Sequence, residues 1–221
     1  MNELERRVLP IQGIAIEQRT IKRADGTEET REVIAGKAVV FNELSQNLGW
    51  FREIIAPNAF DGCDMSDVVC LKNHDNNIPL GRTPDGLTFE IRSDGVYFVS
   101  VPPNTTTAKD AMEEIKTRNI TGCSFQFSIA NNGQEWSTDP DTGGDIRTVT
   151  KIHKLYDVGP VTMPAYLQTS VNTEVAKRSL DAYRAEKREE TPTPAPDPTP
   201  QPEPEIIDTW PAWERKKKAY L

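Results

Sequence analysis

Polar and apolar residues alternate along two pairs of segments, a pattern typical of antiparallel strands with one buried face. Each pair is separated by an Asp-Gly dipeptide, Asp25-Gly26 in the first and Asp94-Gly95 in the second. Asp-Gly between alternating segments is a strong hairpin signal. We therefore predict two β-hairpins, formed by residues 9–20 with 32–41 and by residues 87–91 with 96–101.

Three further segments predict strands, one predicts a helical turn and two predict helices. The expected strands are residues 50–56, 68–71 and 146–158, and the expected helices are residues 105–118 and 172–190. Pro57 predicts a single helical turn over residues 57–60, since proline fits the first turn of a helix. Residues 131–145 are polar and contain Asn-Gly and Gly-Gly, which predicts a loop or a hairpin tip.

Strands outnumber helices in this pattern, and they do not alternate regularly with helices. A doubly wound sheet would need that alternation. We therefore expect a mainly β fold of the α+β kind, a closed or nearly closed β-barrel surrounded by a few helices.

Composition and charge restrict the partners. The net charge of −8 argues against nucleic acid or an anionic membrane as the main partner. No stretch approaches the roughly 20 apolar residues of a membrane span, and the N-terminal residues lack the apolar run of a signal peptide. The three cysteines, Cys63, Cys70 and Cys123, form no C-x-x-C pair, so we predict neither a disulfide framework nor a zinc site. We expect a protein that is not secreted, and nothing in the sequence indicates a metal or an organic cofactor.

The C-terminal residues differ in composition from the rest. Residues 191–204 alternate proline with small polar residues, which predicts an extended, semi-rigid linker. Residues 206–221 carry Trp210 and Trp213 beside a basic run. An isolated helix of this length is marginal in water, so these residues are interpreted as a docking peptide or as a disordered remnant.

Ser124 is the candidate nucleophile. It follows Gly122 and precedes the alternating apolar residues of an expected strand, 125–129, although a Gly-x-Ser pair in such a place is more often a simple turn. A serine nucleophile needs a base with a pKa near neutrality, and the chain has only two histidines, His74 and His153. Cys123 faces away from Ser124 on an extended chain, which makes it a poorer candidate.

His74 also has an ordinary interpretation, as a solvated turn residue between Asn73 and Asp75. Asp75 is next to His74 in sequence, but neighbouring side chains on an extended chain point apart. We therefore interpret Asp75 as a turn former and not as the carboxylate partner of the histidine. Arg82 could stabilise an oxyanion or could be a surface residue.

Four blocks of residues resemble, in order and spacing, the signature of the tailed-phage prohead (capsid maturation) serine proteases of the HK97 type. The blocks are residues 51–60, 69–75 with 80–82, 120–127, and 155–165.

The resemblance implies a fold similar to the herpesvirus assemblin proteases and a Ser-His-acid triad of Ser124, His74 and Asp157. Related herpesvirus enzymes use a second histidine as the third member, so His153 is an alternative to Asp157. Two residues depart from the family pattern: Gly159 stands where serine is usual, and Asp157 stands where many members have glutamate.

The resemblance further implies an endopeptidase that works inside the phage procapsid in the host cytoplasm. It would cleave the scaffolding region of the major capsid protein and then itself, with self-association and a peptide substrate among its interactions. The expected organisation is a protease domain over 1–180, the end of a C-terminal helix over 181–190, a linker over 191–205, and a docking or autocleaved peptide over 206–221. The alternative function is a non-enzymatic scaffold protein that recruits capsid subunits through the tail.

Overall fold

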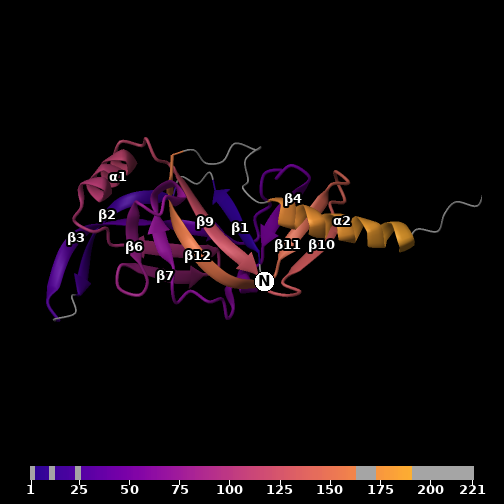
Figure 1. Cartoon of the computed structure of the whole chain (residues 1–221), viewed down its shortest axis with the longest axis horizontal. Coiled ribbons are helices and arrows are strands. Elements are labelled where there is room, and N and C mark those ends of the chain that lie inside the picture. Colours follow the sequence, from indigo (N-terminus) through magenta and orange to yellow (C-terminus); the bar gives the residue numbers. More distant parts are fainter. Residues whose placement is uncertain (1–2, 10–12, 23–25, 163–172, 191–221) are drawn as a thin grey trace, which may run out of the picture. The chain divides into compact units, whose positions relative to one another are not determined.

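The structure is a computed structural model that describes residues 3–9, 13–22, 26–162 and 173–190. The chain divides into two compact units, residues 1–185 and 186–221. The first unit holds three β-sheets and helix α1, and helix α2 runs across the boundary between the units (Figure 1). The expected linker and docking peptide, 191–205 and 206–221, lie outside the described residues.

The largest sheet has five strands in the order β1-β9-β12-β5-β6. β9 pairs antiparallel with β1 on one side and with β12 on the other, and β12 pairs parallel with β5 (Figure 1). The strands are β1 (Leu4–Leu9), β5 (Val69–Leu71), β6 (Pro79–Arg82), β9 (Gly122–Ile129) and β12 (Ile152–Val161).

A four-stranded antiparallel sheet contains both predicted hairpins, which are confirmed. Its order is β2-β3-β8-β7, with β2 (Ile14–Lys22), β3 (Glu28–Val40), β7 (Leu87–Arg92) and β8 (Gly95–Ser100). A third sheet has the order β10-β11-β4, with β4 (Phe51–Ile55), β10 (Gln134–Thr138) and β11 (Asp145–Val149).

The predicted helices are also confirmed. In α1 (Thr106–Lys116) the Thr105 hydroxyl accepts a hydrogen bond from the Ala108 amide at 3.3 Å, and the buried face carries Ala108, Ala111 and Ile115. Helix α2 (Thr173–Glu190) packs Ala176 and Leu180 against the third sheet. Pro57–Phe60 forms the expected turn as η1.

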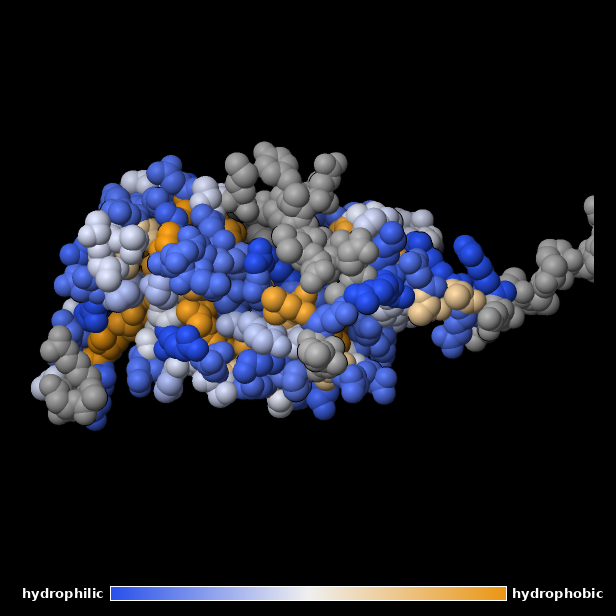
Figure 2. Space-filling view, in the orientation of Figure 1, coloured by the Kyte–Doolittle hydropathy of each residue, from blue (hydrophilic) through white to orange (hydrophobic). Residues whose placement is uncertain are grey.

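Among the described residues, neither helix is both long and apolar enough to cross a membrane. The face shown in Figure 2 is mainly hydrophilic, with small scattered hydrophobic areas.

Two expectations are corrected. Within the described residues none of the sheets closes on itself, so the fold is mainly β but is not a closed barrel. Residues 131–145, expected to be a loop or a hairpin tip, contain β10 and the tip of its hairpin with β11, so the hairpin tip is confirmed. The expected strand 146–158 is two strands, β11 and β12. Backbone hydrogen bonds join Gly133 to Thr150 and Lys151 at the place where the chain passes from one sheet to the next. A single strand pattern in the sequence therefore crosses between two sheets.

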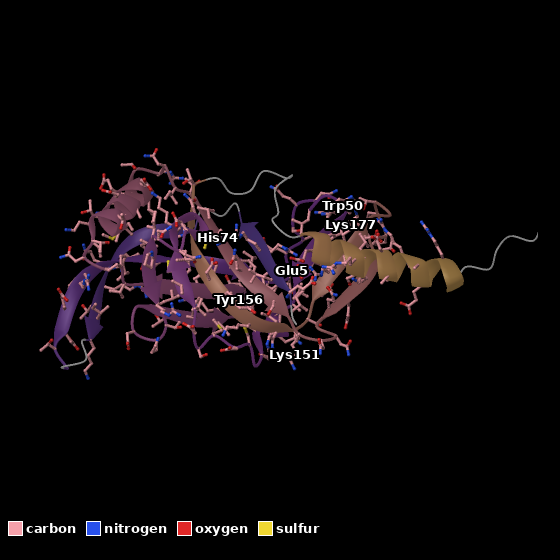
Figure 3. All side chains as sticks on the ribbon, in the orientation of Figure 1. Glu5, Trp50, His74, Lys151, Tyr156 and Lys177 are labelled. Carbon is pink, nitrogen blue, oxygen red and sulfur yellow. The ribbon has the colours of Figure 1, made fainter. Side chains whose placement is uncertain are left out.

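A buried group of four charged side chains connects the first and third sheets. Glu5, which is labelled in Figure 3, and Arg7 come from β1, Glu53 from β4 and Arg147 from β11. Each of the four is at most 5% exposed. Arg7 donates to Glu53 at 2.6 and 2.7 Å, and Arg147 donates to Glu5 at 2.6 and 2.7 Å. The two carboxylates and two guanidinium groups balance in charge, so the network brings no net charge into the interior.

The charges of this network depend on one another. Burial by itself would raise the pKa of Glu5, but the hydrogen bond from Arg147 and the charge of Arg7 lower it below its ordinary value. Burial by itself would lower the pKa of Arg7, but the Glu53 carboxylate raises it. Removal of one member therefore leaves an uncompensated charge in the interior.

We predict that Arg147→Met lowers the free energy of unfolding by about 3–5 kcal/mol, because it leaves Glu5 and Glu53 buried with one cation between them. Urea unfolding followed by circular dichroism measures the change. The matched control is Arg184→Met, which removes an arginine that is half-exposed and paired with Asp145 at 2.6 Å. This change should cost less than about 1 kcal/mol. Equal losses in the two variants would contradict the importance of the buried network.

Candidate active site

Ser124 lies near the start of β9 and is fully buried. The alternation of the strand puts Cys123, Phe125 and Phe127 on one face and Ser124 and Gln126 on the other. The Ser124 Oγ lies 2.6 Å from His74 Nε2 and also donates a hydrogen bond to the backbone oxygen of Arg7 at 2.9 Å. The candidate nucleophile is therefore in contact with its expected base.

His74 ends a short helical turn, η2 (Lys72–His74), that directly follows β5. Asn73 has φ 51° and His74 has φ 59°, so both residues occupy the left-handed region. That conformation costs a non-glycine residue roughly 1–2 kcal/mol. The Asn73 side chain offsets part of this cost, because its Nδ2 donates to Thr162 Oγ1 at 3.1 Å and its Oδ1 accepts from the Thr162 amide at 2.9 Å. The strained turn aims the His74 imidazole back toward β9 and β12.

Asp157 lies on β12, is 4% exposed, and places Oδ1 2.6 Å from His74 Nδ1. Its second oxygen faces Gln126. In the amide orientation that satisfies both neighbours, Gln126 Nε2 donates to Asp157 Oδ2 at 2.7 Å and Gln126 Oε1 accepts from Arg6 Nε at 2.6 Å. Both carboxylate oxygens are therefore held in place, one by the imidazole and one by the amide.

The three side chains come from positions 74, 124 and 157, and they meet because β9, β12 and β5 are consecutive in the sheet. A carboxylate at Nδ1 holds a proton on that nitrogen and leaves Nε2 free to accept the proton of a hydroxyl. The side chains of His74, labelled in Figure 3, and of Asp157 are only 7% and 6% exposed. Little water therefore competes for these bonds.

His153 lies apart from this group of side chains. The expectation that His153 and Asp157 share a face is wrong, because β12 shifts register against β9 between Ile152 and Lys154 and again between Leu155 and Asp157. His153 is exposed whereas Asp157 is buried.

Two other charged candidates have ordinary roles. Asp75 accepts hydrogen bonds from the amide and side chain of Asn77 at 2.8 and 2.9 Å, as expected of a turn former. Arg82 is 60% exposed and pairs with Asp67 at 2.6 Å. Among the described residues, no three His, Cys, Asp or Glu side chains are arranged to hold a metal ion.

Sequence reasoning missed three groups around Ser124, His74 and Asp157. The Gln126 amide contacts Asp157, the Arg7 carbonyl contacts Ser124, and the Asn73 side chain holds the turn of His74 through Thr162. Gln126 could have been found from the strand alternation, which places it on the same face as Ser124. The Arg7 carbonyl could not have been found, since nothing in residues 3–9 indicates that they pair with β9.

A serine, an imidazole and a carboxylate in this order are typical of serine hydrolases. A family model described as caudovirus prohead serine protease matches residues 18–186. The chain belongs to this family and is a serine protease, which confirms the family expected from the four sequence blocks and removes the non-enzymatic alternative.

The other two comparisons, with solved structures and with curated proteins, add no argument about the function. A solved structure described as the bacteriophage T4 capsid assembly protease, gp21, is similar with a TM-score of 0.42 and 11% identity, over 71% of this chain and 98% of that chain. A search of curated proteins gave no match.

Cys123 is a poor nucleophile in its observed position. It is buried on the face of β9 opposite Ser124, and burial raises the pKa of its thiol far above the ordinary value. Burial also raises the pKa of Cys70 to about 12 and that of Cys63 to about 11. All three thiols are therefore neutral near pH 8, where thiolates are the reactive form.

We predict that iodoacetamide at pH 8 leaves proteolysis unchanged. A raised pKa keeps the thiol protonated until the pH approaches that pKa, so alkylation of the native chain should be slow at Cys70 and Cys123. Intact mass spectrometry and a cleavage assay check this, with urea-unfolded chain as the positive control for alkylation. Rapid loss of activity together with a modified Cys123 would contradict the assignment of Ser124 as nucleophile.

Close packing accounts for one departure from the family pattern, the glycine at position 159. It pairs with Ser124 across the sheet, and a Cβ atom at this position would lie 2.0 Å from the backbone oxygen of Leu71. Leu71 is the last residue of β5, just before the turn that carries His74. A side chain at Gly159 would therefore push β5 and His74 away from β12.

We predict that Gly159→Ala lowers the cleavage rate at least about 100-fold, because a displacement of about 1 Å at His74 is enough for such a loss. The control is Gly144→Ala, where the nearest atom, Thr142 Oγ1, is 3.4 Å from the added Cβ. A rate assay on both variants, each shown to be folded by circular dichroism, checks the prediction. Near-normal activity of Gly159→Ala would show that β5 does not need this close approach.

Proposed function

We propose that Ser124, His74 and Asp157 are the catalytic triad of an endopeptidase that cleaves the scaffolding region of phage capsid subunits. The observation that carries the proposal is the pair of 2.6 Å contacts that His74 makes, one to Ser124 and one to Asp157. Membership of the prohead serine proteases supports the choice of substrate and an action inside the procapsid within the host cell.

In the proposed mechanism the Ser124 Oγ attacks the carbonyl carbon of the scissile peptide bond, while His74 Nε2 takes the hydroxyl proton. Asp157 holds the proton on Nδ1 and stabilises the imidazolium that forms. As the tetrahedral intermediate collapses, His74 gives the proton to the leaving amine and an acyl-enzyme remains. Water then attacks the acyl carbon with His74 again as base, and Ser124 is regenerated.

In this mechanism two side chains hold the triad in place without contacting the substrate. Gln126 holds the second oxygen of Asp157, and Asn73 holds the turn that aims His74. Both are positioning residues.

We also propose that the enzyme cleaves itself and that residues 206–221 either dock on a partner or are removed in that reaction, with residues 191–205 as the connecting linker.

We predict that Ser124→Ala and His74→Ala each lower cleavage by roughly 10⁴–10⁶-fold, because the nucleophile or its base is lost. Asp157→Ala should cost less than either change. Co-expression with the capsid protein followed by gel electrophoresis measures whether the capsid subunit shortens.

His153→Ala is the matched control, since it removes the other histidine, which is exposed, and it should leave cleavage unchanged. Shortening of the capsid subunit that persists in Ser124→Ala would place the catalytic serine elsewhere. Loss of cleavage in His153→Ala equal to that in His74→Ala would reject Asp157 as the only third member.

A further inference from the structure

β1 covers the edge of β9 that lies beside Ser124. The two strands pair antiparallel over six residues, with Val8 opposite Ser124 and Arg7 opposite Phe125 (Figure 1). β1 is the outermost strand of its sheet. Ser124 is fully buried, and its Oγ touches both His74 and the Arg7 carbonyl. An incoming peptide therefore has no open approach to the serine from this edge.

The contact with Arg7 differs from the geometry of attack. A carbonyl under attack presents its carbon to the serine oxygen, while its own oxygen points to hydrogen-bond donors. Here the Ser124 hydroxyl donates to the Arg7 oxygen. The hydroxyl has one proton, so a proton shared with Arg7 is less available to His74. β1 thus occupies the place of a peptide beside the serine but does not react.

An extended peptide commonly binds by adding a strand to an exposed sheet edge, where backbone hydrogen bonds supply affinity. The β9 edge meets this description once β1 is absent, and it begins next to the nucleophile. The register shows how such a peptide lies, antiparallel to β9 with one backbone carbonyl at Ser124.

The two charges that β1 contributes to the buried network, those of Glu5 and Arg7, cancel one another. Glu5 and Arg7, both on β1, pair with each other at 2.7 Å. Glu53 and Arg147, which stay behind, pair at 3.1 Å. Departure of β1 therefore divides this network into two neutral pairs, while the partly buried Arg6 leaves Gln126 together with the strand. By contrast, removal of one arginine by mutation leaves a carboxylate in excess.

We propose that the β9 edge beside Ser124 is the docking edge for the peptide to be cleaved, and that β1 must be displaced before that peptide binds. This inference rests on the proposed function of Ser124. The peptide that replaces β1 faces the same Glu53 and Arg147, so the site suits an extended segment with an acidic and a basic side chain two positions apart, as Glu5 and Arg7 are in β1.

The test locks β1 in place with a disulfide in the full chain. Leu4 lies opposite Ser128, two residue pairs beyond Gln126 and away from the catalytic groups, so Leu4→Cys with Ser128→Cys joins the far end of β1 to β9. The readouts are the rate at which a fluorophosphonate probe labels Ser124 and the cleavage of co-expressed capsid protein. We expect oxidation to lower both rates at least about tenfold by removing the open form, and dithiothreitol to restore them.

The matched control is Thr20→Cys with Thr30→Cys, which locks an exposed strand pair remote from Ser124. These threonines lie opposite one another with their Oγ1 atoms 3.3 Å apart. Oxidation of this pair should change neither rate, and mass spectrometry of the digested chain shows which cysteines are joined.

The outcomes separate this inference from the proposed function. Equal labelling and cleavage in the oxidised and reduced β1 lock, both dependent on Ser124, would overturn the displacement of β1 and leave the proposed triad standing. No Ser124-dependent labelling or cleavage in the wild-type chain would overturn the proposed function, and this inference with it.

Hydrogen–deuterium exchange gives a second measurement on the wild-type chain, should the cysteine pair fail to fold or to close. Attachment of the phosphonate to Ser124 requires the Arg7 carbonyl to move, so the amides of residues 5–9 should exchange at least about tenfold faster in the adduct. The amides of β2 and β3 are the internal control and should not change. Unchanged protection of residues 5–9 in the adduct would overturn the inference.

Discussion

The close approach of β5 to β12 at Gly159 is the constraint on which the site depends. Parallel pairing of these strands places Leu71 against Gly159, where there is no room for a Cβ atom. β5 has only three residues, and its position determines where the chain turns at Lys72–His74. Because Asp157 and Gly159 are on β12 and Ser124 is on the next strand, one tight contact brings the imidazole within reach of both partners. The left-handed backbone of Asn73 and His74 then orients the imidazole, and this conformation has a local energetic cost.

The buried network around β1 specifies where this strand lies. Buried ion pairs contribute little net stability, because the cost of removing charges from water offsets much of their attraction. Four hydrogen-bonded charges nevertheless fix the register of β1, since a shift of one residue would turn Glu5 and Arg7 to the opposite face. Apolar side chains in place of these charges would stabilise the strand more, but they would specify its register less strictly. The paired charges therefore specify the position of this edge strand, in addition to its backbone pairing with β9.

The sequence predicted the local elements well and the long-range arrangement less well. Hairpins, η1 and both helices depend on neighbouring residues, such as the Asp-Gly turns and the Thr105 cap, and these signals are read directly. β1 could not be predicted, because Glu5, Arg6 and Arg7 look like an exposed terminus. They are buried or partly buried only because Glu53, Arg147 and Gln126 come to them from distant parts of the chain. The barrel expectation failed for the same reason, since alternation identifies strands but does not say which strands pair or whether a sheet closes.

The site shows the same division between local and distant information. Without the family resemblance, Ser124 is only a weak candidate and His74 is more simply a polar turn residue, because a Gly-x-Ser pair before a strand is more often a turn. Their meaning depends on a contact between residues 50 positions apart. His153 was a reasonable alternative on an ideal strand, but the two register shifts in β12 change which side chains point inward. A bulge inserts one extra residue into a strand and has no motif that can be recognised in the sequence. A prediction from regular alternation therefore fails where a bulge changes the face on which a functional side chain lies.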